Sequence, residues 1–347
     1  MESQLQMSGL PRQEQFSGCL IGQCLGDALG FRVEGHSEKV CRDYVTNELR
    51  FKNFKENFSF PFPFGQYTDD SQLARELLKS YVVLGGKFDE SNYARRIADI
   101  FTEKRIVGRG KSTEAAALRL AQGVPWQEAG SKPPAAGNGS AMRAGPIGLF
   151  FFDNPQKLIR AAYNQGRITH QDTRCSAGSI AIAGAVALAL RDAKINPESF
   201  LLDLSKWTHK VDSSFPIYLE DLINWLPLPP EEAVKFISKA GMTQDLNKWP
   251  GISPFVVSSV LWSLYSFLKT PDDYWETICT AIAVGGDVDT TAAMAGAISG
   301  AHMGLGAIPL DLAKKLNDRG TWGFTELVEL ADKCYELICK SRQTGQK

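Results

Sequence analysis

The amino-acid sequence predicts an all-α protein with one large core. Apolar side chains recur every three or four residues through many stretches, which is the spacing of one face of a helix. We find no series of alternating strands joined by hairpin dipeptides that would indicate a sheet. Of the 347 residues, 44% are apolar and 22% are charged, as in an ordinary globular protein rather than a disordered one.

The predicted helices follow one another along most of the chain. Leu73, Leu77 and Tyr81 recur at four-residue steps and predict one helix, and Tyr93 and Ile97 predict the next. The same periodicity predicts helices over residues 156–163, 173–192, 254–268, 272–283, 289–303 and 324–340.

The prolines and glycines between these helices do not form a long polar linker. We therefore expect a single compact domain over residues 16–341, although the chain length would allow two domains. The polar segment over residues 1–15 carries no apolar signal sequence, and we expect it to be flexible.

Charge and cysteine content argue against several classes of protein. The chain has 38 basic and 39 acidic residues, a balance that does not favour binding to a nucleic-acid backbone. Its seven cysteines are odd in number and form no CxxC pair, which favours a reducing cytoplasmic compartment, or the nucleus, over disulfides or a zinc site. The longest apolar stretch, residues 176–190, is short and rich in Ala and Gly, so we expect no membrane span. The near-neutral charge and the absence of a heptad seam favour a monomer.

Aromatic residues are concentrated just before the most polar motif of the chain. Six phenylalanines and two prolines lie between Arg50 and Gly65, and the prolines argue against a central strand. The rings could simply pack on neighbouring helices. They could also form one wall of a ligand site, because the stretch leads directly into an acidic cluster.

Two acidic clusters each lie immediately before a predicted helix. Either cluster alone is explained by helix capping, but capping needs a single oxygen-bearing side chain. Adjacent carboxylates repel each other unless a cation or several donors hold them. If the clusters meet in the fold, they supply four Asp and two Thr, an all-oxygen set suited to two Mg²⁺ ions. The six residues are Thr68, Asp69, Asp70, Asp287, Asp289 and Thr290.

Three smaller motifs carry further candidates, each with a structural alternative. Asp27 precedes Glu34 in a glycine-containing stretch, where Asp27 could be a buried structural carboxylate and Glu34 a general base. The turn over residues 137–140 could bind phosphate through its backbone N–H groups, or be an ordinary turn capped by Ser140. His170 also precedes a helix, and could be structural or donate a hydrogen bond to an anion.

Taken together and in this order, five motifs resemble the ADP-ribosylglycohydrolase family. They are GDALGFRVE (26–34), GQYTDDSQLA (65–74), GNGSAMR (137–143), THQD (169–172) and GGDVDTTAAMAGAISGA (285–301). The resemblance covers nearly the whole chain. It implies an orthogonal helical bundle with two Mg²⁺ ions, sometimes Mn²⁺, in a cleft. It also implies a hydrolase that binds ADP-ribosylated acceptors and releases ADP-ribose.

The resemblance also assigns roles by position. The six oxygen-bearing residues of the acidic clusters look like the metal ligands, and none of them is substituted. Glu34 falls where several members have a glutamate that acts as base or gate, and Asp69 and Asp70 join it as the catalytic candidates. The candidates for binding ADP-ribose are Gly110, Gly137, Asn138, Gly139, Ser140 and His170.

Two other functions remain open on the same scaffold. The protein could bind ADP-ribose without catalysis or serve a crystallin-like structural role, although the intact ligand set favours an enzyme. It could instead hydrolyse the diphosphate of nucleotides. The acceptor is also open, and could be arginine, serine, poly(ADP-ribose), an acetylated ADP-ribose or a nucleic-acid end.

Overall fold

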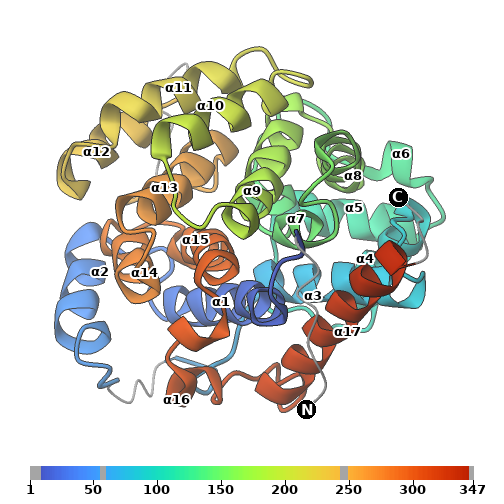
Figure 1. Ribbon diagram of the computed structural model, residues 1–347, viewed down its shortest axis with the longest axis horizontal. Helices are drawn as coiled ribbons and strands as arrows, with labels where there is room; N and C mark the ends of the chain where they lie inside the picture. The colour runs from blue at the N-terminus through green and yellow to red at the C-terminus, as the bar shows by residue number, and fades with distance from the viewer. Residues whose placement is uncertain (1–8, 55–59, 243–248, 344–347) are drawn as a thin grey trace.

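A computed structural model of the protein describes residues 9–54, 60–242 and 249–343. Within these ranges the chain forms seventeen α-helices, and its β contacts are isolated bridges only. The prediction of an all-α fold is therefore confirmed. Figure 1 shows the helices gathered around a central pair, α1 (Gln13–Phe31) and α15 (Val288–Met303).

Helices α1 and α15 pack antiparallel with their backbones in contact. Gly22 makes this possible, because a Cβ atom there would lie 2.4 Å from the carbonyl oxygen of Gly296. At Gly26 a Cβ atom would lie 2.2 Å from the carbonyl oxygen of Ala292. This packing brings the C-terminal end of α1 beside the start of α15, where the second acidic cluster lies.

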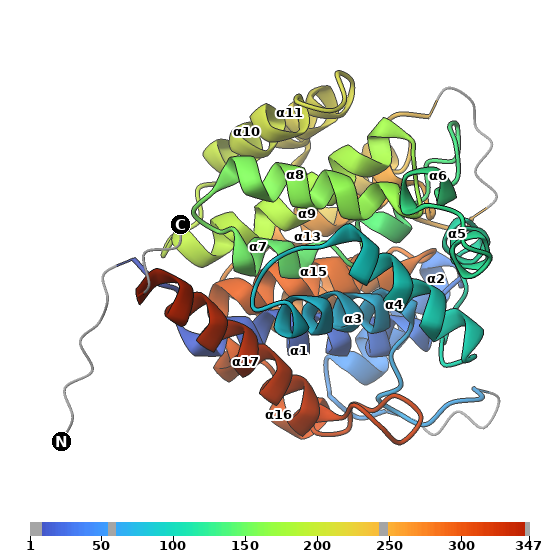
Figure 2. The same cartoon turned by 90° about the vertical axis from the view of Figure 1, so that its right-hand side faces the viewer.

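The neighbouring helices enclose this pair and form one core. Figure 2 shows α3 (Asp69–Val83) and α17 (Phe324–Gln343) beside α1, and both helices contact it. Helices α9 (Thr173–Arg191), α13 (Val256–Lys269) and α14 (Tyr274–Ala283) pack against α15. The other α-helices are α2 (Glu38–Tyr44), α4 (Glu90–Thr102), α5 (Lys111–Ala121), α6 (Trp126–Ala129), α7 (Gly145–Phe150), α8 (Pro155–Arg167), α10 (Pro197–Thr208), α11 (Phe215–Trp225), α12 (Pro230–Ile237) and α16 (Leu310–Ala313). The short helical turns are η1 (Val45–Leu49), η2 (Asn138–Ser140) and η3 (Leu305–Ala307).

The predicted helices are all present, but the periodicity missed several others. The helices that were not predicted are α2, α5, α6, α7, α10, α11, α12 and α16. Helix α1 begins at Gln13, three residues inside the segment that we expected to be flexible, and residues 1–8 lie outside the described ranges. All seven cysteines carry free thiols.

Helix α9 is longer than the apolar stretch suggested. By length and composition alone it could cross a membrane, which the sequence analysis did not expect. However, 89% of its most apolar window is buried inside the protein. Its surroundings are helices α7, α8, α10, α13 and α15, so it is a core helix of the bundle.

The aromatic stretch before the first acidic cluster packs on the end of α1. The rings of Phe31 and Phe60 lie 5.0 Å apart between centroids, and those of Phe54 and Phe64 lie 4.7 Å apart. The packing interpretation therefore holds for these described rings. Phe58 falls outside the described residues.

Candidate functional site

The two acidic clusters meet at the ends of α3 and α15. Asp69 and Asp70 form the first turn of α3, and Asp289 and Thr290 lie in the first turn of α15. Thr290 lies close enough to Asp70 to lower the pKa of its carboxyl, and the charge of Asp70 raises the pKa of Asp287 and Asp289, so the clusters face each other. Segments more than 200 residues apart in the sequence thus form one site.

Asp27, on α1, holds the first cluster in place. Its carboxylate accepts hydrogen bonds from the backbone N–H groups of Thr68, at 3.0 Å, and Ser71, at 3.1 Å. These groups belong to the N-terminus of α3, where four N–H groups have no partner within the helix. The Thr68 hydroxyl lies between two carboxylates, 2.9 Å from Asp27 Oδ1 and 3.0 Å from Asp70 Oδ2. Asp27 therefore has the structural role that the sequence analysis offered as one interpretation.

A turn at Gly285 and Gly286 places the second cluster. Gly286 has φ +92°, and a Cβ atom there would lie 2.0 Å from the carbonyl oxygen of Ile252. The Gly286 carbonyl accepts a hydrogen bond from the N–H of Gly35 at 2.8 Å, so the turn also holds the segment that follows α1. That segment carries Glu34.

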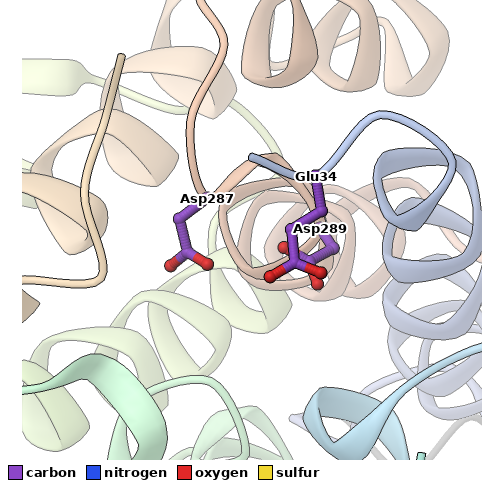
Figure 3. A group of neighbouring side chains, drawn as sticks. All are labelled: Glu34, Asp287 and Asp289. Atoms are coloured by element: carbon purple, nitrogen blue, oxygen red, sulfur yellow. The ribbon is translucent and has the colours of Figure 1, made fainter. Parts of the chain in front are cut away.

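As a result, three carboxylates lie together at the start of α15. Glu34, Asp287 and Asp289 each place an oxygen within 4.8 Å of the others. Figure 3 shows Glu34 beside Asp289, with Asp287 facing them. Glu34 is exposed, whereas the two aspartates are buried.

The electrostatics of the cluster favour a bound cation. Asp69, Asp70, Asp287 and Asp289 are at most 7% exposed. Burial raises the pKa of all four carboxyls, and repulsion between neighbouring carboxylates raises them further. In the described part of the chain, none of the ion pairs involves these groups.

Two oxygens of the cluster also lack a partner. The Oδ1 atoms of Asp70 and Asp289 are buried and have no hydrogen bond within the described residues. Buried polar atoms usually have a partner, so these two oxygens are available to a further ligand. An all-oxygen, mostly anionic donor set with free oxygens fits a hard divalent cation such as Mg²⁺.

The loop before α5 closes against Asp69. Gly108 has φ +76°, and a Cβ atom there would lie 2.5 Å from Asp69 Oδ1. The backbone N–H of Gly110 donates a hydrogen bond to the Asp69 carboxylate. The side chain of Gln72 fixes this loop by accepting a hydrogen bond from the N–H of Val107 at 2.8 Å. The structure thus places Gly110 beside the acidic clusters, as the resemblance implied.

The turn at η2 is tied to the same site. Asn138 donates a hydrogen bond from its side chain to Asp287 Oδ2 at 2.5 Å. Ser140 is fully buried, and its hydroxyl donates to the carbonyl of Cys175 at 3.2 Å. The Ser140 side chain is therefore used within the protein, which leaves only its backbone N–H for the predicted contact with a ligand.

His170 lies against this turn. Cβ atoms added at Gly137 and Gly139 would lie 3.5 Å and 3.4 Å from His170 Nε2. Burial, together with the positive charge of Arg143, lowers the pKa of His170 to about 3, so the imidazole is neutral. Gly110 thus lies against the first acidic cluster, residues 137–140 form the adjoining turn, and His170 lies against that turn.

Comparison with known proteins identifies the family. The family model described as ADP-ribosylglycohydrolase matches residues 9–344. The chain belongs to the ADP-ribosylglycohydrolase family. A solved structure described as an ADP-ribosylglycohydrolase-related protein complex is similar, with a TM-score of 0.67, 25% identity, and coverage of 94% of this chain and 99% of that one.

For two of the relatives below, the similarity extends over nearly the full length of both chains. An uncharacterized protein of Archaeoglobus fulgidus is 31% identical, over 94% of this chain and 97% of its own length. ADP-ribosylhydrolase ARH3 of Xenopus tropicalis is 28% identical, over 95% and 97% of the two chains. ADP-ribosylarginine hydrolase Tri1 of Pseudomonas putida is 22% identical, over 87% of this chain and 74% of its own.

Sequence reasoning missed one contact and one residue of the candidate site. The contact of Asn138 with Asp287 joins the turn to the acidic clusters, whereas Asn138 was expected only to bind substrate. Arg143 is fully buried and donates to the carbonyl of Gly139 at 3.0 Å. The signal that could have indicated Arg143 is its position in the GNGSAMR motif, three residues after Ser140. Arginine is almost never fully buried unless it is paired, so the sequence alone did not predict its burial.

Proposed function

We propose that this protein is an Mg²⁺-dependent hydrolase that removes ADP-ribose from modified acceptors. The bond broken joins the acceptor to the anomeric carbon of the distal ribose. The observation that carries the proposal is the meeting of the two acidic clusters, with buried oxygens that lack partners. It is supported by relatives named as an ADP-ribosylhydrolase and an ADP-ribosylarginine hydrolase.

Six side chains would hold two Mg²⁺ or Mn²⁺ ions in this proposal. When bound, the ions would offset the repulsion between the buried carboxylates and act as Lewis acids toward hydroxyl groups of the distal ribose. The ligands would be Thr68, Asp69, Asp70, Asp287, Asp289 and Thr290.

The carboxylates of the chain account for the chemistry at the anomeric carbon. Glycosidic cleavage builds positive charge on the sugar, which Asp69 and Asp70 stabilise as fixed negative charges. Water adds to the anomeric carbon as the bond to the acceptor breaks, and the acceptor leaves with a proton. Glu34 is exposed as a whole residue, but its carboxyl is partly desolvated beside Asp289, and this desolvation raises its pKa. A more basic carboxylate is better suited to take the proton of the attacking water.

The turn at η2 and His170 would hold the diphosphate of ADP-ribose. Because Asn138 contacts Asp287, a ligand bound at the turn lies next to the carboxylates. Binding and cleavage are thereby joined in one site, which favours reaction through proximity.

The test is a panel of ADP-ribosylated conjugates, on arginine, serine, the polymer and an acetyl ester, each with Mg²⁺ and with a chelator. We expect free ADP-ribose from at least one conjugate with Mg²⁺ and none with the chelator. AMP as the product would instead identify a phosphohydrolase. Tight binding of ADP-ribose without turnover of any conjugate would support the non-catalytic alternative.

A further inference from the structure

A chain of hydrogen bonds runs from Arg143 to His170. The guanidinium of Arg143 donates to Thr169 Oγ1 at 2.8 Å, and Thr169 Oγ1 lies 2.8 Å from His170 Nδ1. Arg143 and Thr169 are fully buried, and His170 is 2% exposed. Arg143 also donates to the carbonyl of Gly139 and to Gln165, so it is fixed on several sides.

The direction of these bonds fixes the proton on the imidazole. Arginine has donors only, so Thr169 Oγ1 must accept from it. A hydroxyl oxygen can accept twice, but if Nδ1 donated to Thr169 Oγ1, the buried hydroxyl proton of Thr169 would have no acceptor among the described contacts. We therefore take His170 Nδ1 as the acceptor of that proton. An Nδ1 atom that accepts carries no proton, so a neutral imidazole must carry its proton on Nε2.

The neighbouring charges agree with a neutral ring. Burial and the positive charge of Arg143 lower the pKa of His170 to about 3. The carboxylate of Asp172 raises the pKa of His170, but this carboxylate forms an ion pair with Arg174 at 2.8 Å. An imidazolium would place a second buried positive charge beside Arg143.

Nε2 faces the glycine turn. Glycine at residue 139 lets the turn lie close to the ring, because a Cβ atom there would lie 2.9 Å from His170 Cε1 and 2.9 Å from Thr113 Oγ1. The N–H of Nε2 is therefore close to the backbone of the turn.

We infer that Arg143 and Thr169 are positioning residues that hold His170 as a neutral Nε2–H donor, directed at an oxygen of an anionic ligand in the glycine turn. The inference rests on the proposed function for the identity of that ligand, the diphosphate of ADP-ribose. It assigns His170 a fixed donor role and excludes it as a general acid or base.

The protonation state can be measured directly. The chain has four histidines, so His170 can be assigned in nitrogen-15 spectra of the full-length protein by comparison with His170→Gln. We expect an unprotonated Nδ1 and a protonated Nε2 in the wild type at neutral pH. A proton on Nδ1, or on both nitrogens, would overturn the inference.

Matched variants test the role of Thr169. Thr169→Val keeps the shape of the side chain and removes the hydroxyl, whereas Thr169→Ser restores the hydroxyl. We expect the valine variant to lose the wild-type nitrogen signals and to bind ADP-ribose about tenfold more weakly in the presence of Mg²⁺. The serine variant should recover both. Thr208→Val is the control, because Thr208 is equally buried but bonds to Leu204 in α10.

The outcomes separate this inference from the proposed function. Unchanged nitrogen signals and unchanged affinity in Thr169→Val would overturn the inference, whether or not the protein is a hydrolase. A wild type that shows the Nε2–H form but binds no ADP-ribose would support the network and contradict the proposed function. Arg143→Lys keeps the positive charge but loses the planar guanidinium and its several fixed N–H donors. Wild-type affinity for ADP-ribose in that variant would show that Arg143 does not position His170.

Discussion

Binding of Mg²⁺ at neutral pH should release protons from this protein. Burial raises the pKa of Asp70 to about 7 and that of Asp287 to about 8. Without a cation, these two carboxyls together hold roughly one to two protons at pH 7, and the protons must leave when the oxygens bind a metal. Burial raises the pKa of Asp69 and Asp289 as well, which adds to the release. Because protons compete with the cation, Mg²⁺ affinity should increase as the pH rises through this range.

Calorimetric titration with Mg²⁺ in buffers of different ionisation enthalpy measures the release. The slope of the observed enthalpy against the buffer enthalpy gives the number of protons, and we expect at least about one at pH 7. Asp287→Asn removes one of the two groups and should reduce both the release and the affinity. Asp272→Asn is the control, because that side chain is 87% exposed and lies outside the clusters. If the wild type binds Mg²⁺ and the observed enthalpy does not depend on the buffer, no proton is released and the prediction is refuted.

Three further changes test other parts of the account. Asp289→Ala should lower turnover about a hundredfold or more and weaken Mg²⁺ binding while circular dichroism shows intact helices, and wild-type turnover would rule out this ligand. Glu34→Gln should retain Mg²⁺ but lose about 10²–10⁴ in rate, and an unchanged rate would exclude it as the base. Gly22→Ala places a Cβ atom 2.4 Å from the Gly296 carbonyl oxygen, so the free energy of unfolding should fall by about 1–3 kcal/mol in denaturant titrations. An unchanged midpoint would contradict the close packing of α1 and α15.

The sequence predicted the long helices because their apolar faces are regular. Leu73, Leu77 and Tyr81 are all fully buried, as their spacing requires. Helices α10 and α11 were missed although each carries a proline in its first turn, a common position at helix starts. Proline also occurs in turns, so by itself it did not indicate a helix at either position.

The carboxylates of the acidic site could be predicted from local sequence patterns, but the contacts that bring them together could not. Carboxylates at two helix starts are visible in the sequence, whereas their meeting depends on the packing of α1 against α15. The capping of α3 by Asp27 and the contact of Asn138 with Asp287 join segments 41 to 149 residues apart. Such contacts follow from tertiary structure, which no local pattern encodes.

The central claim is that the two acidic clusters jointly hold divalent cations. Anomalous diffraction from crystals of the protein grown with Mn²⁺ tests it most directly, because the peaks locate the metal without any assumption about the reaction. The account predicts two peaks between Asp69–Asp70 on one side and Asp287–Asp289 on the other. Peaks elsewhere, or none between these side chains at saturating Mn²⁺, would contradict it.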